Sequence, residues 1–299
     1  MDAVALLQVG SAFLLNVGFT WLVGSWFARR WLRSNGAGGT DAEPGLRRYD
    51  QLAAGLCALS SAIALLVATA VMGDVGLREA CPMFWMMLTS TDYGHAGSIT
   101  VAAMLALLLV RAFGSDGRAS DLGAALALTL FAVTRASMGH AGEDGFLSVA
   151  LAAEAVHYAA IGLWTGAVIV SAWCALSEAH IGTAAIGAYD HYLDRMSQAA
   201  MAAVIAIFVT GIYSAWHRVG TVDHLQHTFY GLTLLLKVAL VLVAIGLGGY
   251  NKFIGLPAAS RSAQGLRKVC FALRIESVVL LAVVLAASIL TSQPPPAAM

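Results

Sequence analysis

Long apolar segments alternate with short polar joints along the whole chain of 299 residues. A helix needs about 20 mostly apolar residues to cross the hydrocarbon core of a bilayer. The pattern therefore predicts an all-α, polytopic transmembrane bundle that forms a single domain over residues 1–299. The eight expected spans are residues 4–28, 49–73, 95–113, 120–139, 146–176, 196–217, 228–251 and 268–291.

One further segment, residues 75–93, is amphipathic rather than apolar throughout. A helix of this kind lies in the membrane interface when its apolar side faces the acyl chains. We therefore expect it either at the interface or as an outward extension of the third span.

The composition agrees with a membrane protein and excludes several other classes. Hydrophobic residues make up 59% of the chain and charged residues 11%, and the mean hydropathy is +0.78, whereas about a quarter of the residues of a soluble domain are charged. The net charge of zero gives no support for nucleic-acid binding. The four cysteines form no C-x-x-C pair, and the sequence contains no hydrolase or phosphate-loop motif. We therefore expect neither a disulfide framework nor an enzyme.

Basic residues gather in two of the joints between spans and predict the orientation, because positively charged loops remain in the cytoplasm. Both termini are then periplasmic. Residues 34–45 form a flexible cytoplasmic loop in this interpretation, and residues 292–299 form a disordered tail. The basic residues of the two joints are Arg29, Arg30, Arg33, Arg47, Arg48, Lys252, Arg261, Arg267 and Lys268.

This orientation places most of the histidines on the outer side. His95 begins the third span there, His140 follows the fourth, and His157 lies in the outer half of the fifth. Imidazole is the commonest metal ligand in proteins. Three other histidines fit polar residues of the membrane interface equally well: His217, His224 and His227.

The fifth span carries ionisable residues on one helical face. Glu154, His157, Ile161 and Trp164 follow the spacing i, i+3, i+7 and i+10. An ionisable side chain within a span costs roughly 2.5 to 3.5 kcal/mol on insertion scales and normally faces the bundle interior. This face is therefore expected to point inward.

The candidate metal ligands form a series that descends from the outer surface. His95 and His140 lie at its mouth, His157 lies deeper, and Met138 stands beside His140 as a thioether donor. Thioether and imidazole together suit copper, as Cu(I) or Cu(II), better than magnesium or calcium.

Two pairs of opposite charges are expected to be structural. Lys237 and Glu276 both fall near the midplane of consecutive antiparallel spans, which predicts a salt bridge between them, since either charge alone would be costly in lipid. A proton relay through these two residues is the alternative. Arg135 and Glu154, near the outer ends of adjacent spans, predict a second pair.

Four stretches carry a family resemblance: "GHAG" at 139–142, "HYAAIGLWTGA" at 157–167, "YGLTLLLKVALVLVAIGLGGYNKFIGLP" at 230–257 and "RIESVVLLAVVLAASIL" at 274–290. In order and spacing, the chain resembles the copper resistance protein D family, most strongly over residues 138–291.

The resemblance implies a copper-binding, multi-pass protein of the bacterial inner membrane that moves copper from periplasm to cytoplasm in copper homeostasis or resistance. It also implies a periplasmic copper-binding chaperone as a separate partner protein. His140 and His157 match the two recognisable histidines of the family, and Lys237 and Glu276 match its midspan charges.

Two other functions stay open from the residues alone. A membrane cytochrome b for electron transfer would hold haem between two inward histidines at matching depth on different spans, and only His157 lies clearly within a span. A sensor or assembly factor could bind periplasmic copper without transporting it.

Overall fold

The computed structural model of the chain describes residues 3–34, 42–114, 117–142, 145, 148–176, 189–219 and 228–293. Every element in this part of the chain is helical, and eight of the helices are long and apolar enough to cross a membrane. The predicted fold class, an all-α bundle of eight spans, is thereby confirmed. Residues 35–41 of the predicted loop and residues 294–299 of the predicted tail lie outside the described residues.

The helices match the predicted spans closely, but several extend further at the end of the bundle away from the termini, which is the inner end in the predicted orientation. The eight long helices are α1 (Ala3–Ser34), α2 (Ala42–Gly73), α4 (Asp92–Phe113), α5 (Arg118–Ser137), α6 (Val149–Val170), α8 (Asp190–Val219), α10 (Phe229–Tyr250) and α12 (Ala263–Thr291). The short elements are α3 (Leu77–Ser90), η1 (His140–Gly142), η2 (Ser171–Ala175), η3 (Asn251–Gly255) and α11 (Leu256–Ala259). Helices α2, α8 and α12 begin before residues 49, 196 and 268, because hydropathy marks only the part of a helix that lies in lipid.

The amphipathic segment forms α3, a separate short helix rather than an extension of the third span. Its C-cap residue, Thr91, is extended and serves as the N-cap of α4, where its hydroxyl accepts a hydrogen bond of 2.9 Å from the Gly94 amide. A side chain at Gly94 would collide with the backbone of Met87 and Leu88. The chain therefore turns sharply between α3 and α4, and a glycine is required where the two helices meet.

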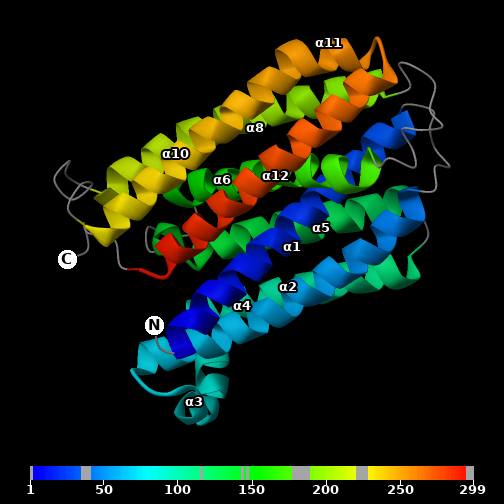
Figure 1. Cartoon of the computed structure of the whole chain (residues 1–299). Coiled ribbons are helices and arrows are strands. Elements are labelled where there is room, and N and C mark those ends of the chain that lie inside the picture. The colour runs from blue at the N-terminus through cyan, green and yellow to red at the C-terminus, as the bar shows by residue number, and fades with distance from the viewer. Residues whose placement is uncertain are drawn as a thin grey trace.

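Helices α1 and α6 lie side by side at the centre of the bundle (Figure 1). Helices α2, α4 and α5 pack on one side of this central pair, and α8, α10 and α12 pack on the other. The start of α1 and the end of α12 lie at the same end of the bundle (Figure 1), as an even number of spans requires.

The two central helices approach each other closely at a pair of glycines. A Cβ atom added to Gly24 would collide with the backbone of Gly166, and one added to Gly166 would collide with Thr20 and Gly24. Small residues of this kind let helix backbones pack tightly in a membrane, where apolar side chains gain little from leaving lipid. Glycine at both positions therefore sets the distance between α1 and α6.

A buried ionic cluster joins α1, α2 and α4 at the inner end of the bundle. Asp50 forms an ion pair with Arg29, and its carboxylate lies 3.4 Å from Nε of Arg111. The three side chains are 1%, 3% and 5% exposed, respectively. The Trp21 indole also donates a hydrogen bond of 3.1 Å to Asp50. One carboxylate thus lies between two guanidinium groups on neighbouring helices.

We expect Asp50→Asn to destabilise the protein strongly. Removing one partner of a buried ion pair leaves uncompensated charge and costs about 3 to 5 kcal/mol. SDS-induced unfolding of the purified protein in detergent measures this loss. Asp121→Asn is the matched control, because Asp121 pairs with Arg33 at 3.1 Å where both side chains are partly exposed, and such a pair contributes below about 1 kcal/mol. Equal stability of the two variants would contradict a structural role for Asp50.

Candidate functional site

The ionisable face of α6 points toward α8. Ser148 caps the start of α6 by accepting a hydrogen bond of 3.1 Å from the Leu151 amide. Near this end, His157 Nδ1 lies 2.8 Å from the Thr210 hydroxyl, and Glu154 accepts a hydrogen bond of 3.4 Å from Ser214. Thr210 and Ser214 are one turn apart on α8, so the two helices meet along a polar seam.

The Thr210 hydroxyl lies between the His157 imidazole and the backbone of α8. It donates to the Ala206 carbonyl at 2.6 Å and lies within hydrogen-bond distance of His157 Nδ1. An imidazole that donates through Nδ1 carries its lone pair on Nε2, the nitrogen through which it would then bind a metal ion. His157 lies eight residues into α6, or about 12 Å below its outer end at 1.5 Å per residue.

A second polar group, on α12, contacts the same face of α6 at a deeper level. Glu276, near the middle of α12, is 2% exposed. Its Oε1 accepts a hydrogen bond of 3.1 Å from the Trp164 indole, and its Oε2 accepts one of 3.3 Å from the Asn251 amide. Gly248 of α10 leaves room for the carboxyl, since a Cβ there would lie 3.4 Å from Oε1. Three helices therefore contribute to the environment of this one side chain.

The structure does not bring Lys237 to Glu276. Gly248, which is level with Glu276, is eleven residues further along α10 than Lys237, a separation of about 16 Å along the helix. The prediction counted the depth of each residue from the ends of the apolar segments. Helix α12 begins earlier than assumed, and α10 continues through η3 into α11. The register of the two helices therefore differs from the predicted one.

Two π-helical segments, neither of them predicted from the sequence, contact α12 near this group. In η2, the carbonyl of Ala172 accepts a hydrogen bond of 3.4 Å from Arg274, and the Trp173 indole donates one of 3.1 Å to Ser277. In η3, the first residue is Asn251, the partner of Glu276. π-Helical turns occur frequently at functional sites. Asn251 is a polar residue at the end of an apolar run, which is the signal that could have identified it.

Two of the residues predicted at the mouth, His95 and Met138, have described side chains, and these two have different partners. His95 is exposed, and its Nε2 lies 3.1 Å from the Thr89 carbonyl. Met138 is the C-cap residue of α5, and its sulfur lies 3.9 Å from Nη1 of Arg135. The described residues contain no group of three histidine, cysteine, aspartate or glutamate side chains that could hold a metal ion. Several histidines fall outside the description, either entirely or with their side chains: His140, His180, His217, His224 and His227.

Arg135 and Glu154 also have different partners in the structure. The Arg135 guanidinium contacts the Met138 sulfur, whereas Glu154 faces Ser214 on α8. The hydrogen bonds of the two described side chains therefore lead to different elements.

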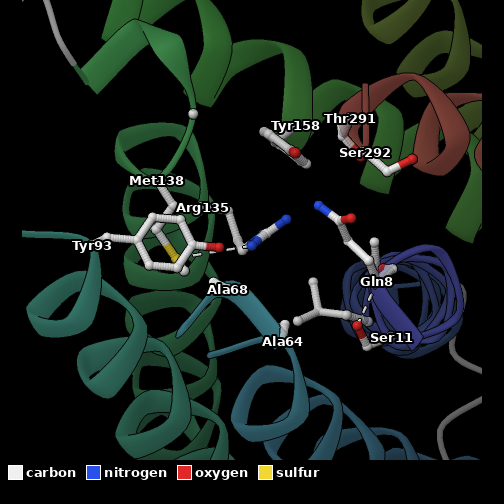
Figure 2. Close-up of a pocket in the computed structure, with 13 residues that line it drawn as sticks. Gln8, Ser11, Ala64, Ala68, Tyr93, Arg135, Met138, Tyr158, Thr291 and Ser292 are labelled. Atoms are coloured by element: carbon white, nitrogen blue, oxygen red, sulfur yellow. Dashed lines mark hydrogen bonds between the residues drawn. The ribbon is translucent and has the colours of Figure 1, made fainter. Parts of the chain in front are cut away.

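A cavity of about 130 Å³ (Figure 2) lies at the end of the bundle that holds the two termini, which is the outer end in the predicted orientation. It has space for several water molecules. Arg135 points into it, and neighbouring positions of the lining are polar (Figure 2). Its lining residues are Gln8, Ser11, Ala12, Leu15, Ala64, Ala68, Tyr93, Arg135, Met138, Gly139, Tyr158, Thr291 and Ser292.

The environment of Glu276 leads to a prediction on stability. In Glu276→Leu, the indole of Trp164 and the amide of Asn251 lose their acceptor, and each buried donor left unsatisfied costs about 1 to 3 kcal/mol. In Glu276→Gln, the amide oxygen still accepts from Trp164, so we expect most of the stability to remain. SDS-induced unfolding compares the two variants. Should Glu276→Gln lose as much stability as Glu276→Leu, the negative charge itself would be required, and the salt-bridge hypothesis would return.

Comparison with known proteins gives matches along most of the chain. The family model described as Copper resistance protein D matches residues 190–290, and the model described as Copper resistance protein D-like, N-terminal domain, matches residues 1–149. The chain is 27% identical over 228 residues to Copper resistance protein D of Pseudomonas syringae pv. tomato, an alignment that covers 73% of this chain and 74% of that protein. No solved structure matches.

Proposed function

The chain belongs to the copper resistance protein D family, and from this membership we propose that it moves copper ions across the bacterial inner membrane, from periplasm to cytoplasm. Its eight membrane-crossing helices make it a multi-pass protein of that membrane. Copper is its cargo. A periplasmic copper-binding chaperone, a separate protein, would deliver the ion at the outer end.

The observation that carries the proposal is the polar seam between α6 and α8. His157 lies inside the membrane, about 12 Å below the outer end of its helix, with its Nδ1 against the Thr210 hydroxyl. An ionisable side chain at this depth is costly in lipid, and such residues within spans mark functional sites. Imidazole is a suitable ligand for copper.

The neighbouring residues suggest how an ion would pass His157. His140 follows the outer end of α5 and is the candidate ligand above it. Below it, the carboxyl of Glu276 lies about 10 Å deeper along α6, at the level of Trp164. Met138 is the weaker candidate, because the Arg135 guanidinium contacts its sulfur and would repel a copper cation. His95 is the outermost of the four proposed ligands.

The direction of transport follows the family resemblance, and the orientation of the bundle follows charge. The basic residues of the joints between α1 and α2 and between α10 and α12 favour the cytoplasm for that end of the bundle. The histidine-bearing ends of α4 and α5 then face the periplasm, where copper would enter.

Copper uptake by spheroplasts tests the proposal, because their inner membrane is accessible from its periplasmic side. We expect cells that produce the protein to accumulate radioactive copper faster than cells without it. His157→Ala is expected to lower the initial rate at least about tenfold, since losing one buried ligand removes more than 1.4 kcal/mol of binding.

His191→Ala is the matched control, because His191 is exposed at the inner end of α8. Its rate should stay within twofold of the wild type. Unchanged uptake in His157→Ala would show that the ion does not pass through the polar seam. Slower copper accumulation in cells that produce the wild-type protein than in cells without it would indicate export.

A further inference from the structure

The outer cavity contains a cation and, among its described lining residues, no carboxylate. Arg135 reaches into it from the last turn of α5 (Figure 2). The remaining polar lining is neutral and includes hydroxyl and amide groups from other helices: Gln8, Ser11, Tyr93, Tyr158 and Ser292. The positive charge of Arg135 therefore dominates the electrostatics of this space.

The guanidinium of Arg135 has more N–H donors than there are acceptor atoms around it. It carries five N–H donors, and its contact in the structure is the Met138 sulfur, a weak acceptor at 3.9 Å. Its Nε is buried without a hydrogen-bond partner among the described residues. The Arg135 side chain is partly buried, and a buried N–H without an acceptor is costly, so a ligand that supplies negative charge and acceptor atoms would be stabilised here.

We propose that this cavity binds a small oxyanion, a carboxylate or phosphate group, with Arg135 as its main contact. The planar guanidinium presents two parallel N–H groups that match two oxygens of such an anion. The hydroxyls of Tyr93 and Tyr158 and the amide of Gln8 line the same space and can donate to the remaining oxygens. The volume of about 130 Å³ suits a group of a few heavy atoms.

The site lies apart from the seam proposed for copper. Tyr158 lines the cavity, whereas His157, the preceding residue, faces Thr210 on α8. Successive residues of a helix point about 100° apart. The anion site therefore rests on Arg135 and its cavity alone, and it stands whether or not the protein transports copper.

Two sources can supply the same chemical group. A free carboxylate or inorganic phosphate can enter from the periplasm, and a phospholipid of the outer leaflet can place its headgroup phosphate in the cavity. Both would use the Arg135 guanidinium in the same manner, and measurements on lipid-free and lipid-bound protein distinguish them.

Nuclear magnetic resonance of the anion tests the proposal on the full-length protein in dodecyl maltoside. Trifluoroacetate is observed by fluorine resonance and inorganic phosphate by phosphorus resonance, and line broadening on protein addition reports binding. Mass spectrometry of the same preparations detects any phospholipid retained after detergent exchange.

Three variants accompany the wild type. Arg135→Gln removes the charge, and Ala68→Leu fills the cavity while keeping Arg135. Arg118→Gln removes an exposed charge from the opposite end of the same helix. Thermal unfolding checks that each variant is folded. If Arg135→Gln does not fold, Ala68→Leu still tests the site.

We expect the dissociation constant of the anion to rise at least tenfold in Arg135→Gln and Ala68→Leu and to stay within twofold in Arg118→Gln. A phospholipid retained by the wild type and lost in Arg135→Gln would support the same site with a lipid headgroup as its source. Equal broadening in all four proteins, or a wild type that shows neither broadening nor a retained phospholipid, would overturn the proposal and leave a water-filled cavity.

Discussion

Polar side chains inside this bundle depend on partners from other helices, because the hydrocarbon core of a membrane offers no water. Asp50 lies between Arg29 and Arg111, and the three residues come from three helices. His157 and Glu276 have neutral hydrogen-bond donors or acceptors on neighbouring helices. Lipid gives little hydrophobic drive for helix association, so these contacts determine which helices lie together and in which register.

Helix α6 separates two environments within the outer half of the bundle. Its face toward α8 carries Glu154 and His157. Another face carries Tyr158, which lines the cavity beside Arg135. A copper cation is favoured at the imidazole and disfavoured near the guanidinium, whereas an anion has the opposite preference. The close contact of α6 with α1 at Gly166 and Gly24 fixes the helix that divides them.

The sequence was sufficient for the eight spans and insufficient for the contacts between them. The number of spans can be read from the sequence, because each span needs a run of apolar residues long enough to cross the bilayer. Side-chain partners depend on helix register, which hydropathy boundaries do not give. The depths of Lys237 and Glu276 were counted from such boundaries, and the actual start of α12 and the continuation of α10 through η3 move the two residues apart. Asp50 lies where the second span was expected to begin, so it resembled an interfacial residue. Arg29 and Arg111 lie at the same inner end, and these two arginines could have indicated that Asp50 is a buried ion-pair partner.

Metal content and the visible spectrum of the purified protein after copper loading test most directly whether the polar seam of α6 binds copper. The wild type should retain copper and show no Soret band, and His157→Ala should lose the metal while keeping its fold. Copper retained equally by His157→Ala would contradict a copper-binding role for the seam, and a Soret band that disappears in that variant would identify a haem protein instead.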